Sequence, residues 1–112
     1  MTPIRKTVSN NLRFIVDRYF HENPKLMSRY LDVPYATVYG WCKGSFSVTE
    51  NWMPILQEEL GIRPWMLFFP QLKKKWDSLV PQPPIDLEKV ESLRLAIGRR
   101  PGDGRKRKEK SK

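Results

Sequence analysis

The sequence predicts an all-α protein: a compact domain of five helices, an additional C-terminal helix and a disordered basic tail. Apolar residues recur at helical spacing in several short segments, most clearly in residues 8–21. Residues that start or stop helices separate these segments, such as Asn23 before Pro24 and the glycines at positions 44 and 61. A length of 112 residues suits one such domain with appendages, and a hydrophobic fraction of 39% argues against full disorder.

These start and stop signals give a boundary for each expected helix. The predicted helices cover residues 8–21, 24–31, 34–42, 52–60 and 63–68, and residues 71–79 add a further amphipathic turn. Thr7 or Ser9 is expected to cap the first helix. Asp32 is expected in the tight turn before the third helix, because aspartate tolerates left-handed backbone. Pro54 makes the fourth helix start late, near Trp52, or distorts its first turn.

The C-terminal third is expected to have its own organisation. Residues 80–84 (VPQPP) form a stiff, extended linker. Asp86 caps a final helix that ends at Gly98, and the helix has a narrow apolar stripe made of Leu87, Val90, Leu93 and Ile97. The predicted domains are residues 1–79, 80–98 and 99–112.

Positive charge is concentrated at the C-terminus. The whole chain has a formal net charge of +9, and residues 99–112 hold eight basic and two acidic residues, a net of +6. Such a tail attracts a polyanion, and nucleic acid is the commonest one. Composition alone leaves DNA, RNA and an anionic membrane open. The phosphate-binding candidates in the tail are Arg99, Arg100, Arg105, Lys106, Arg107 and Lys108.

Cysteine count and apolar runs indicate a cytoplasmic protein. Cys42 is the only cysteine, so no disulfide forms within the chain, which fits a reducing compartment. The N-terminus lacks the apolar core of a secretory signal. The longest apolar run, Trp65 to Phe69, is far too short to cross a membrane. We therefore expect a cytoplasmic, nucleoid-associated protein without a membrane partner.

The sequence offers no support for catalysis. Glu58 and Glu59 are adjacent, so they would point to different faces of a helix rather than form an acid–base pair. No glycine-rich phosphate loop or nucleophile motif is present. A single histidine, His21, and a single cysteine cannot form a zinc site of the Cys/His type. We expect no enzyme activity, no cofactor and no metal.

Residues 27–44 (MSRYLDVPYATVYGWCKG) resemble the lambda-repressor-like, Cro-type helix-turn-helix family. The family's usual form is L-A-x-x-L-G-V-S-x-x-T-I-x-x-W-E-x-G. The matching positions are Met27, Ser28, Leu31, Val33, Thr37, Val38, Trp41 and Gly44. The resemblance extends over about residues 8–69. It implies a five-helix DNA-binding domain that places the helix at 34–42 in the major groove.

The resemblance also assigns the DNA-facing residues. The base-reading positions of the family fall on Tyr35, Ala36, Tyr39 and Gly40, with Lys43 at the end of the helix. The further phosphate candidates are Lys25, Arg29, Ser45 and Ser47. The chain departs from the family's usual Gln, Gly, Ser and Glu at Pro24, Asp32, Pro34 and Cys42 respectively. The reading positions contain no Arg, Gln or Asn. We therefore expect modest base discrimination, through thymine methyl groups and single hydrogen bonds, and a larger contribution from phosphates.

The sequence as a whole predicts a sequence-preferring DNA-binding regulator of the repressor or Cro kind that is common in phages and mobile elements. A homodimer on double-stranded DNA is expected, joined through the helix at 87–97 or the Trp65–Phe69 surface. Two alternatives remain open. One is an antitoxin-like protein-interaction module with a protein partner and autoregulatory DNA binding. The other is an RNA-binding protein that depends mainly on its tail.

Overall fold

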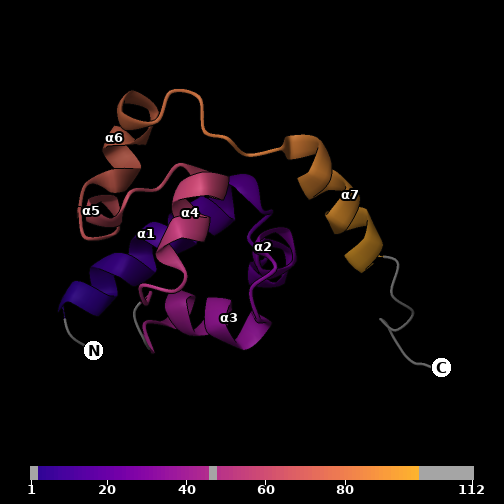
Figure 1. Ribbon diagram of the computed structural model, residues 1–112, viewed down its shortest axis with the longest axis horizontal. Helices are drawn as coiled ribbons and strands as arrows, with labels where there is room; N and C mark the ends of the chain where they lie inside the picture. Colours follow the sequence, from indigo (N-terminus) through magenta and orange to yellow (C-terminus); the bar gives the residue numbers. More distant parts are fainter. Residues whose placement is uncertain (1–2, 46–47, 99–112) are drawn as a thin grey trace.

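The residues described in the structure, 3–45 and 48–98, contain helices and no strands (Figure 1). This computed structural model confirms the all-α prediction for those residues. Within them the helices are α1 (Pro3–Tyr19), α2 (Pro24–Leu31), α3 (Tyr35–Lys43), α4 (Met53–Leu60), α5 (Pro64–Leu67), α6 (Leu72–Leu79) and α7 (Leu87–Gly98). The stretch expected to add one amphipathic turn therefore forms a complete helix, α6. The tail predicted to be disordered, 99–112, lies outside the described residues.

The first helix is longer at its start than the sequence predicted. It begins at Pro3 rather than near residue 8, because proline is well tolerated in a first helical turn. Neither Thr7 nor Ser9 caps it. Ser9 is buried inside the helix, and its hydroxyl donates a hydrogen bond to the carbonyl of Cys42. This bond ties the middle of α1 to the end of α3.

A turn with left-handed backbone ends α1. His21 and Glu22 have φ values of 54° and 60°, a conformation that cannot continue a right-handed helix. Asn23 then caps α2, since its side-chain oxygen accepts a hydrogen bond from the Lys25 amide at 3.0 Å. The helix break predicted before Pro24 is therefore confirmed, and the break fixes where α2 begins.

Helices α2 and α3 are joined by a tight turn. Asp32 adopts a left-handed backbone with φ 58°, as its sequence position predicted. The Asp32 amide donates to the Arg29 carbonyl, and the Val33 amide donates to the Ser28 carbonyl. The following Val33 is buried. α3 packs against both α2 and α1 and ends at Gly44, whose φ of 78° closes the helix. Two short helices are thus held at a fixed angle.

Two tryptophans organise the core. Trp41 faces inward from α3, as predicted, and Trp76 faces inward from α6 onto α1. The indole nitrogen of Trp76 donates a hydrogen bond of 2.7 Å to the Tyr19 hydroxyl, and Phe14 meets the same indole edge-on. The other large side chains with almost no exposed surface are Phe20, Leu12, Ile15, Leu26, Met27, Leu56, Leu60, Ile62, Leu67 and Leu72.

Helices α4 and α5 are short, and both contain proline in their first turn. α4 begins at Met53 after Trp52, which confirms the late start expected from Pro54. α5 ends without a glycine, so its last carbonyls need other donors. The buried amide of Asn11 supplies them: its nitrogen lies 3.2, 2.9 and 3.0 Å from the carbonyl oxygens of Met66, Leu67 and Phe69.

The C-terminal helix folds back onto its own domain. α7 packs against α2, with Val90 buried between them. The Asp86 amide donates to the Tyr30 hydroxyl at 2.9 Å, and the Asp86 carboxylate caps the helix as predicted. Of the predicted apolar stripe, Val90 is buried and Leu93 and Ile97 are half-buried, whereas Leu87 is exposed. Leu87 lies in the first turn of α7 and is 62% exposed.

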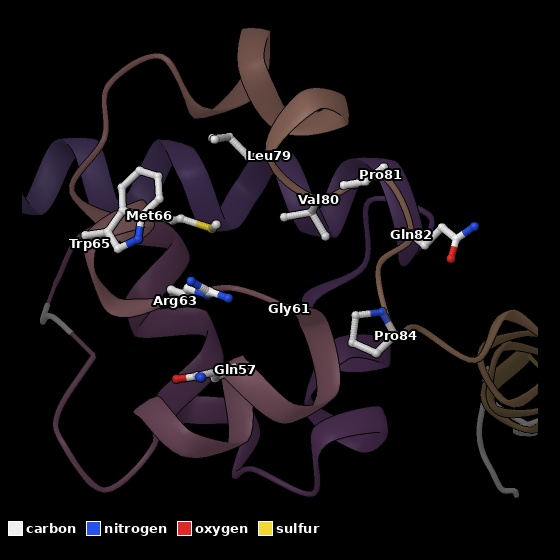
Figure 2. Close-up of a pocket in the computed structure, with 10 residues that line it drawn as sticks. All are labelled: Gln57, Gly61, Arg63, Trp65, Met66, Leu79, Val80, Pro81, Gln82 and Pro84. Atoms are coloured by element: carbon white, nitrogen blue, oxygen red, sulfur yellow. The ribbon is translucent and has the colours of Figure 1, made fainter.

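The linker between α6 and α7 passes close to the end of α4. Gly61, Arg63, Trp65, Val80 and Pro84 are among the residues that line a groove of about 690 Å³ there (Figure 2). Gly61 has φ 78°, and a β-carbon at this position would meet Pro84 Cδ at 2.9 Å and Val80 Cγ1 at 3.2 Å. The close approach of the linker therefore depends on glycine.

Replacing Gly61 with alanine is expected to destabilise the fold by about 1–3 kcal/mol, through left-handed strain and the displaced linker. Urea unfolding measures the change. In a Pro84→Ala background the loss should be smaller, because the nearest clashing atoms are gone while the backbone strain remains. An equal loss of stability in both backgrounds would show that Pro84 does not clash with a β-carbon at position 61.

None of the helices in residues 3–45 and 48–98 combines the length and the apolar composition that crossing a lipid bilayer requires.

Candidate nucleic-acid interface

The outward face of α3 carries most of the residues that the sequence assigned to base contact. Tyr35 and Tyr39 are 46% and 43% exposed, and Ala36 and Lys43 are exposed as well. The placement of Gly40 on this face is wrong, because Gly40 is buried. It precedes the inward-facing Trp41, so this flank of the helix turns toward the core. Four of the five predicted positions therefore share an accessible face.

The two tyrosines form one ordered surface. Their rings stack with centroids 5.6 Å apart and planes inclined by 28°. The Lys43 ammonium lies over the Tyr39 ring, 5.2 Å from its centroid. Residues four apart on a helix are neighbours, so 35, 39 and 43 follow one another along the same stripe. The stripe presents two rings and a positive charge to solvent.

The opposite face of α3 anchors the stripe. Val38 and Trp41 are buried, and the carbonyls of Gly40 and Trp41 accept the capping amides of Ser45 and Gly44. A surface of this kind stays in place because the helix beneath it cannot rotate without exposing its core residues.

Two hollows flank the stripe. One, of about 660 Å³, is lined by Arg13, Val16, Asp17, Glu22, Pro24, Tyr39, Cys42 and Lys43. The other, of about 460 Å³, is lined by Lys25, Ser28, Arg29, Asp32, Val33, Pro34 and Tyr35. The first contains equal numbers of basic and acidic residues, and the second has one more basic than acidic residue. The formal charge beside the stripe is therefore close to balanced, with one excess positive charge on the α2 side.

The predicted phosphate contacts fall into two groups. Lys25 and Arg29 lie on α2 beside the start of α3, Lys25 half-buried and Arg29 exposed. Ser45 is exposed just beyond the end of α3. These three residues surround the stripe. Ser47 and the six tail candidates, Arg99, Arg100, Arg105, Lys106, Arg107 and Lys108, lie outside the described residues.

Two basic residues of α1 join this region, although the sequence did not assign them a role. Arg5 Nη1 donates a hydrogen bond of 3.1 Å to the Ser45 carbonyl. Arg13 is exposed and lines the same hollow as Tyr39 and Lys43. In the sequence, only the positive charge of these two side chains suggests a role in binding a polyanion. The packing of α1 against α3, a tertiary contact, is what brings them to the stripe.

α7 packs against α2, the helix that precedes α3. Figure 1 shows α7 running beside α2. His21 at the α1–α2 turn lies 3.7 Å from the Glu91 carboxylate of α7. Lys89 of α7 covers the Tyr30 ring of α2. These contacts orient the helix from which the basic tail continues.

The Cys42 thiol is buried beneath the stripe. Burial raises the pKa of Cys42 to about 11, an effect that Arg13 partly offsets. The thiol is therefore protonated at neutral pH. Since the thiolate is the reactive form, we expect thiol reagents to modify Cys42 much faster in urea than in the native protein.

The raised pKa of Cys42 also predicts how stability depends on pH. The folded state holds the thiol proton more tightly than the unfolded chain does, so this contribution is complete below about pH 8.5 and is lost as pH rises toward 11. The free energy of unfolding should fall over that interval, and less so in a Cys42→Ala protein. Equal pH profiles for the two proteins would contradict the assignment.

The stripe and its surroundings thus form one candidate interface: an exposed aromatic face on a fixed helix, with basic side chains from α1 and α2 around it. When the chain was compared with known proteins, no family model, no curated protein and no solved structure matched it.

Proposed function

We propose that this protein is a sequence-preferring DNA-binding regulator, of the repressor or Cro kind, which places α3 in the major groove of duplex DNA. In this proposal α2 and α3 act as a lambda-repressor-like helix-turn-helix, and α1 braces them. The observation that carries it is the exposed stripe of Tyr35, Tyr39 and Lys43 on a helix whose other face is buried.

The dimensions of the α2–α3 unit support the proposal. The helices have eight and nine residues and are joined by a turn around the left-handed Asp32. In DNA-binding units of this kind the second helix enters the major groove while the first crosses the backbone. The major groove is wide enough to admit one helix. α3 has an exposed face, and α2 supplies Lys25 and Arg29 beside its start.

Charge supports a polyanionic partner. Of the net charge of +9, residues 1–98 carry +3 and the tail carries +6. Nonspecific affinity would therefore come mainly from the tail, while α3 and its neighbours would set the position on the duplex. This division assigns separate, measurable roles to the two parts of the chain.

A homodimer is part of the proposal. α7, one of the two surfaces expected to join subunits, already buries Val90 against α2 of its own chain. The other surface keeps Trp65 and Phe68 about half exposed. We expect replacement of both by alanine to convert dimers to monomers in sedimentation experiments. Leu87→Ala, which removes a similarly exposed residue from α7, should leave the dimer intact, and the reverse pattern would place the interface on α7.

Selection from random duplex DNA tests the proposal. The full chain and a chain ending at Gly98 are selected separately, and the recovered duplexes are then titrated at several salt concentrations. We expect both proteins to recover the same inverted-repeat site, because α3 and the dimer are common to both. We expect the shorter chain to bind that site more weakly and with less dependence on salt.

A matched pair of variants links the site to α3. Tyr35→Ala combined with Tyr39→Ala should remove the preference for the selected site over random duplex. Leu87→Ala, which changes an exposed apolar residue away from α3, should preserve it. Failure to recover any site, or binding of RNA in preference to duplex DNA, would overturn the proposal. A dimer that binds no nucleic acid would overturn it in favour of a protein-interaction module.

A further inference from the structure

The face that α3 offers to a base pair consists mainly of carbon. Tyr35 and Tyr39 contribute two stacked rings, and the exposed Ala36 contributes a methyl group beside them. The polar atoms on this face are the two phenol hydroxyls and the Lys43 ammonium. Lys43 lies over the Tyr39 ring. The face has no amide or guanidinium group that would bond to two atoms of one base.

The edges of base pairs in the major groove differ in what they offer to such a face. Guanine and adenine present hydrogen-bonding atoms that suit Arg, Lys, Asn and Gln. Thymine presents an acceptor and a methyl group on C5. A methyl group on C5 of cytosine occupies the same place in the groove. Apolar side chains complement that methyl group, and burying it excludes water from both surfaces.

The stacking also argues against an unpaired base as the ligand. Proteins that bind single strands offer open aromatic faces on which bases stack. Here one face of the Tyr39 ring meets Tyr35, and the Lys43 ammonium lies over the same ring. Stacking takes one face of each ring, so less aromatic surface is left for a base to stack on, and the carbon surface that stays exposed can contact a methyl group.

We infer that the stacked pair Tyr35 and Tyr39 selects duplex DNA through the C5-methyl groups of pyrimidines in the major groove, whether thymine or 5-methylcytosine carries them. This inference rests on the proposed function, since it requires α3 to lie in that groove. It adds the chemical feature that the helix reads. The two rings restrain each other, so the methyl-binding surface is formed before DNA arrives.

The test begins with the duplex recovered by selection with the full chain. Each thymine is replaced in turn by deoxyuridine, which removes the C5-methyl group and leaves every hydrogen-bonding atom in place. At each contacted position we expect affinity to fall about fourfold, the effect of burying one methyl group. A 5-methylcytosine–guanine pair at the same position should bind more tightly than a cytosine–guanine pair. Equal binding of those two pairs, at a position where thymine is preferred over deoxyuridine, would restrict the methyl source to thymine.

Protein variants connect the effect to the tyrosines. Tyr39→Phe keeps the ring and loses the hydroxyl, so its affinity should still depend on the methyl group. Tyr39→Ala removes the ring, and it should bind the thymine and deoxyuridine duplexes alike. Tyr39 is exposed, so neither substitution removes a core contact.

The outcomes separate this inference from the proposed function. If a site is recovered but deoxyuridine binds as well as thymine throughout, the methyl inference is wrong and duplex recognition by α3 stands. If the methyl effect persists in Tyr39→Ala and in Tyr35→Ala, other residues read the methyl group and the assignment to the stacked pair is overturned. If no duplex is recovered, both ideas fail.

Discussion

A chain ending at Gly98 should bind duplex DNA with a much weaker dependence on salt than the full chain. The tail it lacks carries a net charge of +6. Each phosphate neutralised contributes about 0.9 to the slope of log affinity against log salt, so the slope should fall by about five units if the whole tail is engaged. Between about 50 and 200 mM salt, that difference amounts to about a thousandfold in affinity.

Fluorescence anisotropy with a labelled random duplex measures both slopes. A full-length control in which every tail arginine is replaced by lysine keeps the charge and should keep the slope. Replacing all eight basic residues of the tail by glutamine removes its positive charge and should reproduce the truncation. If the truncated and full chains had equal slopes, the phosphate contacts would have to lie in residues 1–98.

Trp41→Ala is expected to have the largest effect on stability. The side chain is 1% exposed and joins α3 to the core, and removing a buried tryptophan costs about 3–5 kcal/mol. The free energy of unfolding of a small domain is about 5–15 kcal/mol in total. The variant should therefore unfold at much lower urea concentration, and a substantial fraction of it should be unfolded at 37 °C.

Tyr39→Ala is the matched control because it removes an aromatic ring from the opposite face of the same helix. Its midpoint in urea should stay close to that of the parent, while its preference for the selected site should be lost. Trp41→Ala should show the reverse pattern. Its midpoint in urea should fall, while the molecules that remain folded should keep the preference for the selected site. A large loss of stability in Tyr39→Ala would mean that the stripe serves the fold rather than binding.

The fold could be predicted largely from local signals. Asn23 and Pro24 start α2, Asp32 adopts left-handed backbone after it, and Gly44 and Gly61 end α3 and α4. Each of these effects depends on one residue and its immediate neighbours. Such effects can be inferred from sequence without knowing what the helix packs against.

The sequence is least informative at positions whose exposure and neighbours depend on tertiary packing. The resemblance puts Gly40 on the base-reading face, but that flank of α3 turns toward the core. Helical spacing puts Leu87 and Val90 in one apolar stripe, but packing buries Val90 and leaves Leu87 exposed. Arg5 and Arg13 were not assigned because nothing in the order of residues indicates that α1 lies beside α3.

Methylation interference tests the central claim, that α3 lies in the major groove, most directly. The selected duplex is methylated sparsely, at guanine N7 in the major groove and at adenine N3 in the minor groove, and bound by the chain ending at Gly98, so that the tail cannot contribute. We predict that guanine N7 methylation within each half-site blocks binding. Interference confined to adenine N3, or absent at both atoms, would contradict the placement of α3 in the major groove.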